Sequence, residues 1–251
     1  MCHVCCGPAA APYALCFACR VVAARLGLPL APVLPARLCP LPGPLYTVLL
    51  GYKESAVDEA RRYFAGLVRA LLAAFLAEHG PCITGAAGGP IDRVLAVPST
   101  ARPSGPPLAA LEGLADTVRA AFAGARWAPE LLRRASAPVG HMRPDEGAFA
   151  VRSGPVAPTA PSVRRGSRAL LLDDTYVSGA RAQSAAAALR RAGARSVVIV
   201  PVGRVVRPDL SAVHAAFLQA HPALPDGWCV SSALGAPCAR CLRPQTPAST
   251  E

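Results

Sequence analysis

Buried-strand and helix patterns alternate along the second half of the chain. Residues 169–172 form a continuous apolar run, which is typical of a central strand covered on both faces. Strong helix formers follow at 180–192, and Gly193 supplies a stop signal. Residues 93–97 and 196–202 are further short apolar runs of the same kind. The pattern predicts an α/β fold with a mainly parallel central sheet flanked by helices.

Weaker patterns predict the other elements. Apolar residues recur at helical spacing from Val57 to Leu76, and Ser55 can cap that helix. The segment 21–44 is rich in proline, which predicts an irregular connector. Near the other end of the chain, Asp209 can cap a short helix that ends near Gln219. The remaining segments predict a first strand at 46–52, a loop at 80–89, a helix at 108–122, an irregular basic segment at 127–141, an edge strand at 147–151 and a loop at 155–165.

The composition limits the number of domains and the kinds of partner. At 251 residues the chain has room for one core plus smaller appendages. The formal net charge is +11, and all 26 basic residues except Lys53 are arginine. A basic chain attracts the phosphates of metabolites or of nucleic acid, although the excess of arginine, alanine and proline is equally typical of a GC-rich coding bias.

The N-terminal sequence and the hydropathy indicate the compartment. No uninterrupted apolar stretch has the length of a transmembrane helix, and cysteines stand where a signal peptide would carry basic and then apolar residues. We therefore expect a cytoplasmic protein without membrane insertion. In that compartment paired cysteines bind metal more often than they form disulfides.

Two CxxC pairs near the N-terminus predict a zinc ribbon. Cys2 and Cys5 are followed, after ten intervening residues, by Cys16 and Cys19. Each pair can place two thiolates on one ion, and two pairs complete a tetrahedral zinc site that can fold a short segment. Glycine commonly follows the second cysteine of such a site and here follows Cys6, so either Cys5 or Cys6 is the ligand, and we favour Cys5. A redox or disulfide role for these thiols is the alternative.

The C-terminal segment carries further cysteines. The spacing of Cys238 and Cys241 is that of a metal-binding pair, to which Cys229 and His221 could add ligands. A disordered tail with incidental thiols is the alternative. We therefore divide the chain into a zinc-ribbon and connector segment (1–40), a central domain (41–208) and a C-terminal extension (209–251).

Two adjacent carboxylates end the strand predicted at 169–172. Asp173 and Asp174 are expected at its solvent-facing carboxyl end, and Ser178 and Gly179 stand where backbone amides at a helix start can bind a phosphate. A P-loop nucleotidase is excluded because the only lysine, Lys53, belongs to no glycine-rich loop. The alternative is a structural acidic cap on the helix. Carboxylates plus a phosphate site indicate a phosphorylated sugar as ligand.

At these residues the sequence resembles the ribose-phosphate signature of type I phosphoribosyltransferases. The resemblance implies that the two aspartates hold the ribose hydroxyls of phosphoribosyl pyrophosphate, that Mg²⁺ accompanies this substrate, and that the phosphoribosyl group is transferred to a nitrogen acceptor. Val177 and Arg181 replace the hydroxyl residues that are usual in the family. The residues implied to hold the 5-phosphate are Thr175, Tyr176, Val177, Ser178, Gly179 and Ala180.

A second resemblance, over about residues 1–205, is to the ComF family, which combines a zinc ribbon with a phosphoribosyltransferase domain. It rests on the cysteines, GYK at 51–53, VP at 97–98, GHMRPDEGAFAV at 140–151 and the DDTYVSG loop. It implies that Arg143 acts in catalysis and that Arg102 contacts the substrate. The arginine-rich segment ending in RGFNQ that is usual after VP is missing. The alternative function is a non-catalytic ribose-phosphate sensor, or an accessory factor for DNA uptake that binds single-stranded DNA.

Overall fold

A five-stranded parallel sheet forms the centre of the computed structural model, which describes residues 1–98, 108–135, 139–152 and 165–221. Every pairing in this sheet is parallel, and two short strands, β4 (Leu132–Arg134) and β5 (Phe149–Val151), form a separate antiparallel pair. The order across the sheet is β1 (Arg37–Pro40), β7 (Ser196–Val206), β6 (Arg168–Tyr176), β2 (Arg93–Ala96) and β3 (Arg126–Trp127). The predicted α/β class with a parallel sheet is confirmed.

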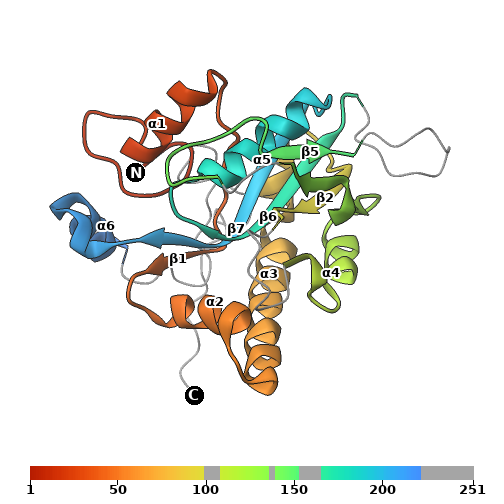
Figure 1. Ribbon diagram of the computed structural model, residues 1–251, viewed down its shortest axis with the longest axis horizontal. Helices are drawn as coiled ribbons and strands as arrows, with labels where there is room; N and C mark the ends of the chain where they lie inside the picture. The colour runs from red at the N-terminus through yellow and green to blue at the C-terminus, as the bar shows by residue number, and fades with distance from the viewer. Residues whose placement is uncertain (99–107, 136–138, 153–164, 222–251) are drawn as a thin grey trace, which may run out of the picture.

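Helices cover both faces of this sheet (Figure 1). Leu170 and Leu172 of β6 belong to the apolar cluster beneath the α2, α3 and α4 helices, whereas Ala169 and Leu171 belong to the cluster on the opposite face, with α5. The helices are α1 (Phe17–Leu26), α2 (Pro44–Glu54), α3 (Asp58–Ala87), α4 (Leu114–Ala121), α5 (Ala180–Arg191) and α6 (Ala212–Ala220), with 3-10 turns at Leu108–Ala110, Pro129–Leu131 and Pro208–Leu210.

Three predictions near the N-terminus are wrong. The segment 46–52 belongs to helix α2 and not to a strand, because its buried residues, Leu49 and Tyr52, lie three apart. The 21–44 connector is not irregular: it contains most of α1, and β1 pairs with β7. The 80–89 loop is part of α3, which continues past Pro81 because Ile83 and Ala87 are buried in the core. Gly88, with a φ of 71°, ends this helix.

The predicted elements of the second half are confirmed with different bounds, except that the segment 127–141, predicted to be irregular, contains the 3-10 turn Pro129–Leu131 and strand β4. Strand β6 extends to Tyr176, so that only residues 177–179 form the loop before α5. The 108–122 segment is a 3-10 turn followed by α4, and the edge strand at 147–151 is β5. Ser211, and not Asp209, caps the helix that follows β7. The loop at 155–165 and the cysteines after residue 221 lie outside the described residues.

Helix α3 is long and apolar enough, by length and composition alone, to cross a membrane. Its residues Leu72, Phe75 and Leu76 are buried in the main apolar cluster, against the sheet and α4. Core helices of soluble proteins have the same composition. Packing within the fold therefore accounts for part of the hydropathy of α3, since 39% of its apolar 18-residue stretch is buried.

Candidate functional site

Four cysteines from the N-terminal segment lie within reach of one metal ion. The Sγ atoms of Cys2, Cys5, Cys16 and Cys19 all lie within 4.8 Å of one another and are buried. Cys16 is the N-cap of α1, and Cys19 belongs to its first turn. Tetrahedral zinc with Zn–S bonds of about 2.3 Å places its sulfurs about 3.8 Å apart, and Cys5 and Cys16 Sγ are 3.7 Å apart. The four cysteines therefore fit a structural metal ion such as zinc.

Cys6 is not part of this cluster. Its backbone has a φ of 53°, the left-handed conformation that glycine usually supplies, and its Sγ lies 3.7 Å from the carbonyl oxygen of Val33. Burial raises the pKa of the Cys6 thiol to about 12. A metal ligand must be deprotonated. The expectation that Cys5 is the second ligand is therefore supported by the geometry of both residues.

Asp173 and Asp174 are buried, and each is already paired with a cation. Asp173 Oδ1 lies 2.8 Å from Arg181 Nη2 on α5, and Asp174 Oδ2 lies 2.6 Å from Lys53 Nζ on α2. Tyr52 donates a hydrogen bond of 2.9 Å to the same oxygen of Asp174. The two side chains are 3% and 8% exposed as residues. The expectation of a solvent-facing pair is wrong, because helices on both faces of the sheet cover the end of β6.

The partners of the two carboxylates set their charge. Burial raises the pKa of Asp173 to about 6, although the Arg181 guanidinium acts in the opposite direction. Burial also acts to raise the pKa of Asp174, but Lys53 and Arg181 outweigh it and hold that pKa below its ordinary value. Burial and the neighbouring Asp174 raise the pKa of the Tyr52 phenol. At neutral pH two carboxylates and two cations therefore form a nearly neutral network.

The loop between β6 and α5 presents backbone amides at a helix start. Gly179 is the N-cap of α5 with a φ of 81°, and it has no side chain of its own to cap this end. A Cβ at Gly179 would lie 2.0 Å from Tyr176 Oη, so glycine is required for both reasons. Ser178 Oγ accepts hydrogen bonds from the amides of Ala180 and Met142. The first turn of a helix has N–H groups without intrahelical partners, which favours an anion here.

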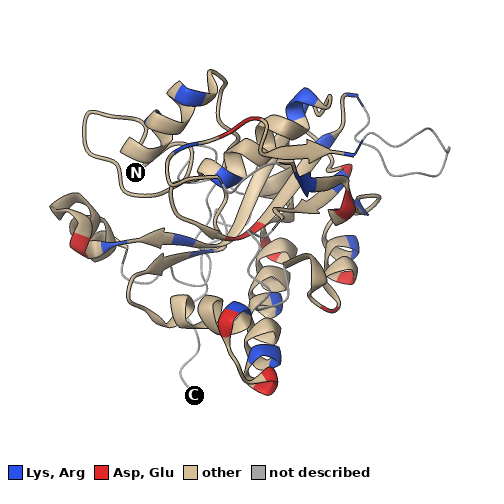
Figure 2. Ribbon diagram, viewed as in Figure 1, with Lys and Arg blue, Asp and Glu red and all other residues tan. Residues whose placement is uncertain are grey.

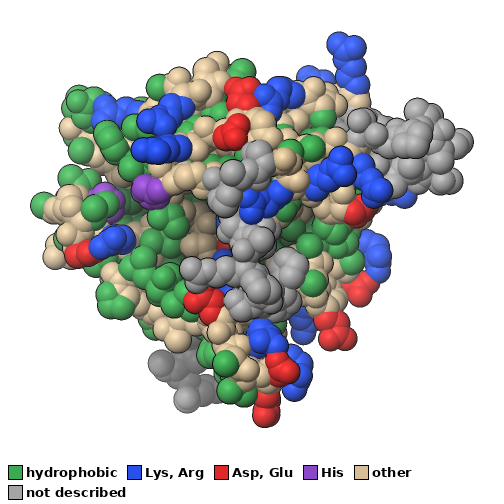
Figure 3. Space-filling model, in the orientation of Figure 1, with side chains coloured by type: hydrophobic (Ala, Val, Ile, Leu, Met, Phe, Trp, Pro, Cys, Tyr) green, Lys and Arg blue, Asp and Glu red, His purple; other side chains and the backbone are tan. Residues whose placement is uncertain are grey.

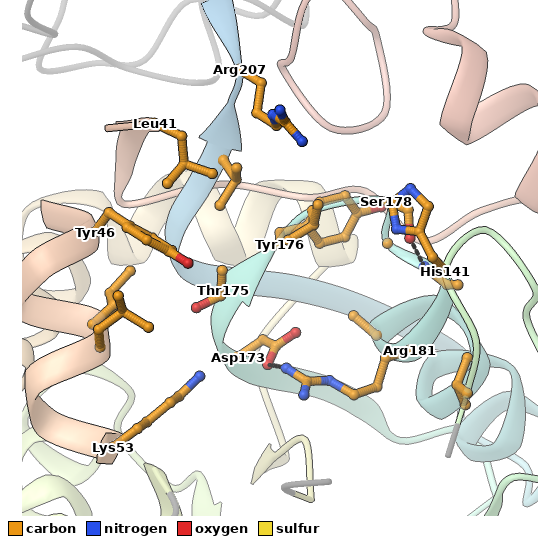
Figure 4. Close-up of a pocket in the computed structure, with 18 of the residues that line it drawn as sticks. Leu41, Tyr46, Lys53, His141, Asp173, Thr175, Tyr176, Ser178, Arg181 and Arg207 are labelled. Carbon is orange, nitrogen blue, oxygen red and sulfur yellow. Dashed lines mark hydrogen bonds and ion pairs between the residues drawn. The ribbon is translucent and has the colours of Figure 1, made fainter. Parts of the chain in front are cut away.

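One cavity of about 730 Å³ joins this loop to Asp173. Figure 4 shows Asp173 and Arg181 joined on one side of it, with Lys53, Tyr46 and Thr175 pointing inward from α2 and β6. The opposite wall combines apolar residues with two basic groups. The remaining described residues around the cavity include Leu41, Leu50, Val205, His141 and Arg207. The cavity is therefore polar at Asp173, at the loop and at Lys53 and Glu54 of α2, and apolar along Leu41, Leu50 and Val205.

Most of the predicted ligand residues line this cavity. They are Asp173, Thr175, Tyr176, Val177, Ser178, Gly179 and Ala180. Asp174 lies behind Asp173 and holds Tyr52 and Lys53 of α2. The structure places Arg143 on an exposed turn that does not line the cavity. Arg102 lies outside the described residues.

Three functional side chains have a role here that the sequence did not predict. Lys53 and Tyr52, both in the GYK motif, reach Asp174 from 121 and 122 residues away in the chain. Arg181, a departure from the family pattern, pairs with Asp173. The one feature of the sequence that distinguishes Lys53 is that it is the only lysine of the chain. Its position in the sequence does not indicate that Asp174 is its partner.

On the one face that the two charge-coloured views show, the charges of the described residues do not form one basic band. In Figure 2 the acidic segment at the end of β6 lies centrally, while most other acidic residues lie on peripheral helices and loops beside basic ones. The uncovered part of the face in Figure 3 carries Lys and Arg in several separate groups. Nucleic-acid grooves generally concentrate basic residues on one surface. This distribution gives no support to a DNA interface.

Comparison with known proteins adds no relative to this picture. No protein-family model matches the chain, and no curated protein or solved structure gives a significant match. The functional argument therefore rests on the residues and the geometry of the two sites.

Proposed function

We propose that this protein binds phosphoribosyl pyrophosphate, or another ribose 5-phosphate, in the cavity at the end of β6, and that its four N-terminal cysteines hold a structural zinc ion. The observation that supports the ligand is that Asp173 and the start of α5 line the same cavity. In α/β sheets ligands bind beyond the carboxyl ends of the strands, next to such helix starts.

The residues of the cavity have distinct roles in this proposal. The backbone amides of the 177–180 segment and the Ser178 hydroxyl bind the 5-phosphate, and Asp173 accepts hydrogen bonds from the ribose hydroxyls. Lys53 and Arg181 place positive charge where a pyrophosphate group would lie. Magnesium bound to pyrophosphate would neutralise part of its charge. We assign no aspartate as its ligand, because both carboxylates already have cationic partners.

Transfer to an acceptor requires one bond exchange. A nitrogen of the acceptor bonds to the anomeric carbon, the bond from that carbon to the pyrophosphate oxygen breaks, and the acceptor loses a proton. Positive charge develops on the ribose during this step, and a carboxylate beside it lowers the barrier. Tyr46, Leu50 and Val205 leave an apolar wall in the cavity against which an acceptor can pack.

The ion pairs favour a second candidate, a ribose-phosphate sensor without turnover. The charge of Asp173 is opposed by Arg181 at 2.8 Å, and that of Asp174 by Lys53 at 2.6 Å. A neutralised pair stabilises a developing positive charge less than two free carboxylates do. Binding of the ligand is common to both candidates, and only turnover separates them.

Calorimetry with phosphoribosyl pyrophosphate and Mg²⁺ tests binding, and pyrophosphate release with purine, pyrimidine and amine acceptors tests turnover. We expect saturable binding by the wild type that is lost in Asp173→Asn. Asp116→Asn, in an exposed ion pair on α4, is the matched control and should bind as the wild type does. A folded wild type that shows no binding at millimolar ligand would refute the proposal, whereas binding without pyrophosphate release would identify the sensor.

A further inference from the structure

A buried arginine lies between the cysteine cluster and the loop before α5. Arg204 of β7 is 5% exposed, and its guanidinium lies 5.4 Å from the centre of the Tyr176 ring. Its Nη2 is 3.5 Å from Cys5 Sγ. Its Nη1 donates to the carbonyl oxygens of Tyr176, at 3.3 Å, and Val177, at 3.0 Å. One side chain therefore contacts both candidate sites.

The charge of Arg204 requires an anion close to it. A buried guanidinium is costly unless it is paired, and among the described residues no carboxylate lies within ion-pair distance of Arg204. Four thiolates around one divalent metal ion carry a net charge of about −2. Cys5, the cluster member that Arg204 contacts, can supply the compensating charge in the metal-bound protein. The metal-bound cluster is thus the electrostatic partner of Arg204.

The two carbonyl contacts determine which way the loop amides point. In a trans peptide the C=O and the following N–H point in opposite directions. Because the carbonyls of Tyr176 and Val177 point toward Arg204, the N–H groups of Val177 and Ser178 point away from it. Val177 and Ser178 also line the cavity. Arg204 therefore orients the backbone that would bind the phosphate.

We propose that Arg204 is a positioning residue that couples metal occupancy of the cysteine cluster to anion binding at loop 177–180. This inference rests on the proposed ribose-phosphate function. Metal binding fixes Cys5, Cys5 fixes Arg204, and Arg204 fixes the peptide planes of the loop. Coupling between two binding sites is reciprocal, so the ligand must tighten the metal by the same factor by which the metal tightens the ligand.

Other contacts also attach the N-terminal segment to α5. Gln183 exchanges two hydrogen bonds of 2.9 Å with the backbone of Ala31. Arg190 donates to the carbonyl oxygen of Pro29. Arg190→Met therefore removes an arginine that joins the same two parts of the molecule, but leaves Cys5 and the loop unchanged. It is the matched control for Arg204→Met.

The test uses the full-length protein with cobalt(II) in place of zinc, so that the sulfur-to-cobalt absorption band reports the cluster while the metal stays bound. We expect ribose 5-phosphate to shift this band in the wild type and in Arg190→Met. In Arg204→Met we expect no shift and an affinity for ribose 5-phosphate about fivefold or more weaker. Arg204→Lys keeps the charge but has one donor nitrogen in place of the two that reach the loop and Cys5, and it should recover only part of the affinity.

Three outcomes are distinguishable. A wild-type band that does not move while ribose 5-phosphate binds, or an Arg204→Met protein that binds it as tightly as the wild type, overturns the coupling and leaves the proposed function intact. Absence of ribose 5-phosphate and phosphoribosyl pyrophosphate binding in every folded protein overturns both. If Arg204→Met does not fold, Arg204→Lys takes its place, together with affinities measured on the wild type. The coupling is supported if the metal increases the affinity for ribose 5-phosphate and ribose 5-phosphate increases the affinity for the metal by the same factor. It is refuted if neither affinity changes.

Discussion

The cysteine cluster and the carboxylate pair are both buried, but they are built in opposite ways. All four cysteines of the cluster come from residues 2–19, so that two turns and a helix start bring them together. The carboxylates are neighbours on one strand, but their partners come from α2 and α5, on opposite faces of the sheet. The cluster is a local site whose four cysteines fit one metal ion. The carboxylate pair is a tertiary site that already carries its own cations.

This difference predicts how the two sites respond to change. Thiolates that share one metal ion are held together by their bonds to that ion. When the metal is removed, only the repulsion between the thiolates remains. Ion pairs held by separate elements lose one contact at a time. We therefore expect the cluster to fail as a unit and the carboxylate network to fail residue by residue. Four predictions test this, from the largest expected effect to the smallest.

The largest effect is expected from removing two ligands of the cluster. Cys16→Ser combined with Cys19→Ser should abolish zinc binding, which contributes about 10 to 16 kcal/mol of apparent free energy in zinc-finger peptides. Metal analysis and thermal unfolding measure the loss. Cys6→Ser is the matched control, because Cys6 lies next to a ligand without being one, and it should keep about one zinc per chain. A well-folded wild type that carries no metal after reducing purification would contradict the cluster.

Asp174→Asn should produce the next largest effect. It leaves Lys53 and the Tyr52 hydroxyl without their carboxylate, and breaking a buried ion pair costs about 3 to 5 kcal/mol. We expect the lower end of that range, because 28% of the Lys53 side chain is exposed. Chemical unfolding measures the change, with Asp116→Asn as the exposed counterpart, where about 0.5 kcal/mol is expected. Equal decreases in the free energy of unfolding of the two variants would show that the buried Asp174–Lys53 pair stabilises the fold no more than an exposed ion pair does.

Gly179→Ala tests the loop. Its Cβ would meet Tyr176, and its φ of 81° is unfavourable for any other residue. Gly166→Ala is the control, since Gly166 has a φ of 86° and open space around it, so that only the left-handed strain of about 1 kcal/mol remains. We expect Gly179→Ala to melt lower than Gly166→Ala and to lose ribose-phosphate binding. Equal melting temperatures of the two variants would mean that the Tyr176 side chain moves away from the new Cβ without loss of stability.

The smallest effect is a change in one pKa. Arg181 lowers the pKa of Asp173 against the larger opposing effect of burial, so Arg181→Gln should raise that pKa above about 6. A folded pKa above the ordinary value of 3.8 means that the folded state binds the proton more tightly, so this group's contribution to stability falls as pH rises from about 4 to 6. In Arg181→Gln that window should extend to higher pH. Carbon NMR of the Asp173 carboxyl gives both values, and an unchanged pKa would show that Arg181 is not its partner in solution.

The hydrophobic pattern predicted the parts of the fold that depend on local chemistry. The continuous apolar run before Asp173 is part of β6, and the alanine-rich segment after Gly179 is α5. Each pattern is compatible with only one type of secondary structure. The β-branched and aromatic residues of 46–52 favour a strand, and only packing on α3 and β7 makes this segment helix α2. Tertiary contacts override the local preference here.

The sequence alone determined the cysteine cluster, the carboxylate pair and the loop before α5, because in each case a short motif places its residues close together in space. The tertiary structure decided how these motifs interact. Alternation from Leu170 and Leu172 would place Tyr176 beneath α2 and α3, yet Tyr176 belongs to the cluster on the other face, with Cys5. Arg204 pairs with Tyr176 across the two strands and so reaches the same side. A partner's identity depends on the register and twist of neighbouring strands, which no single segment of sequence contains.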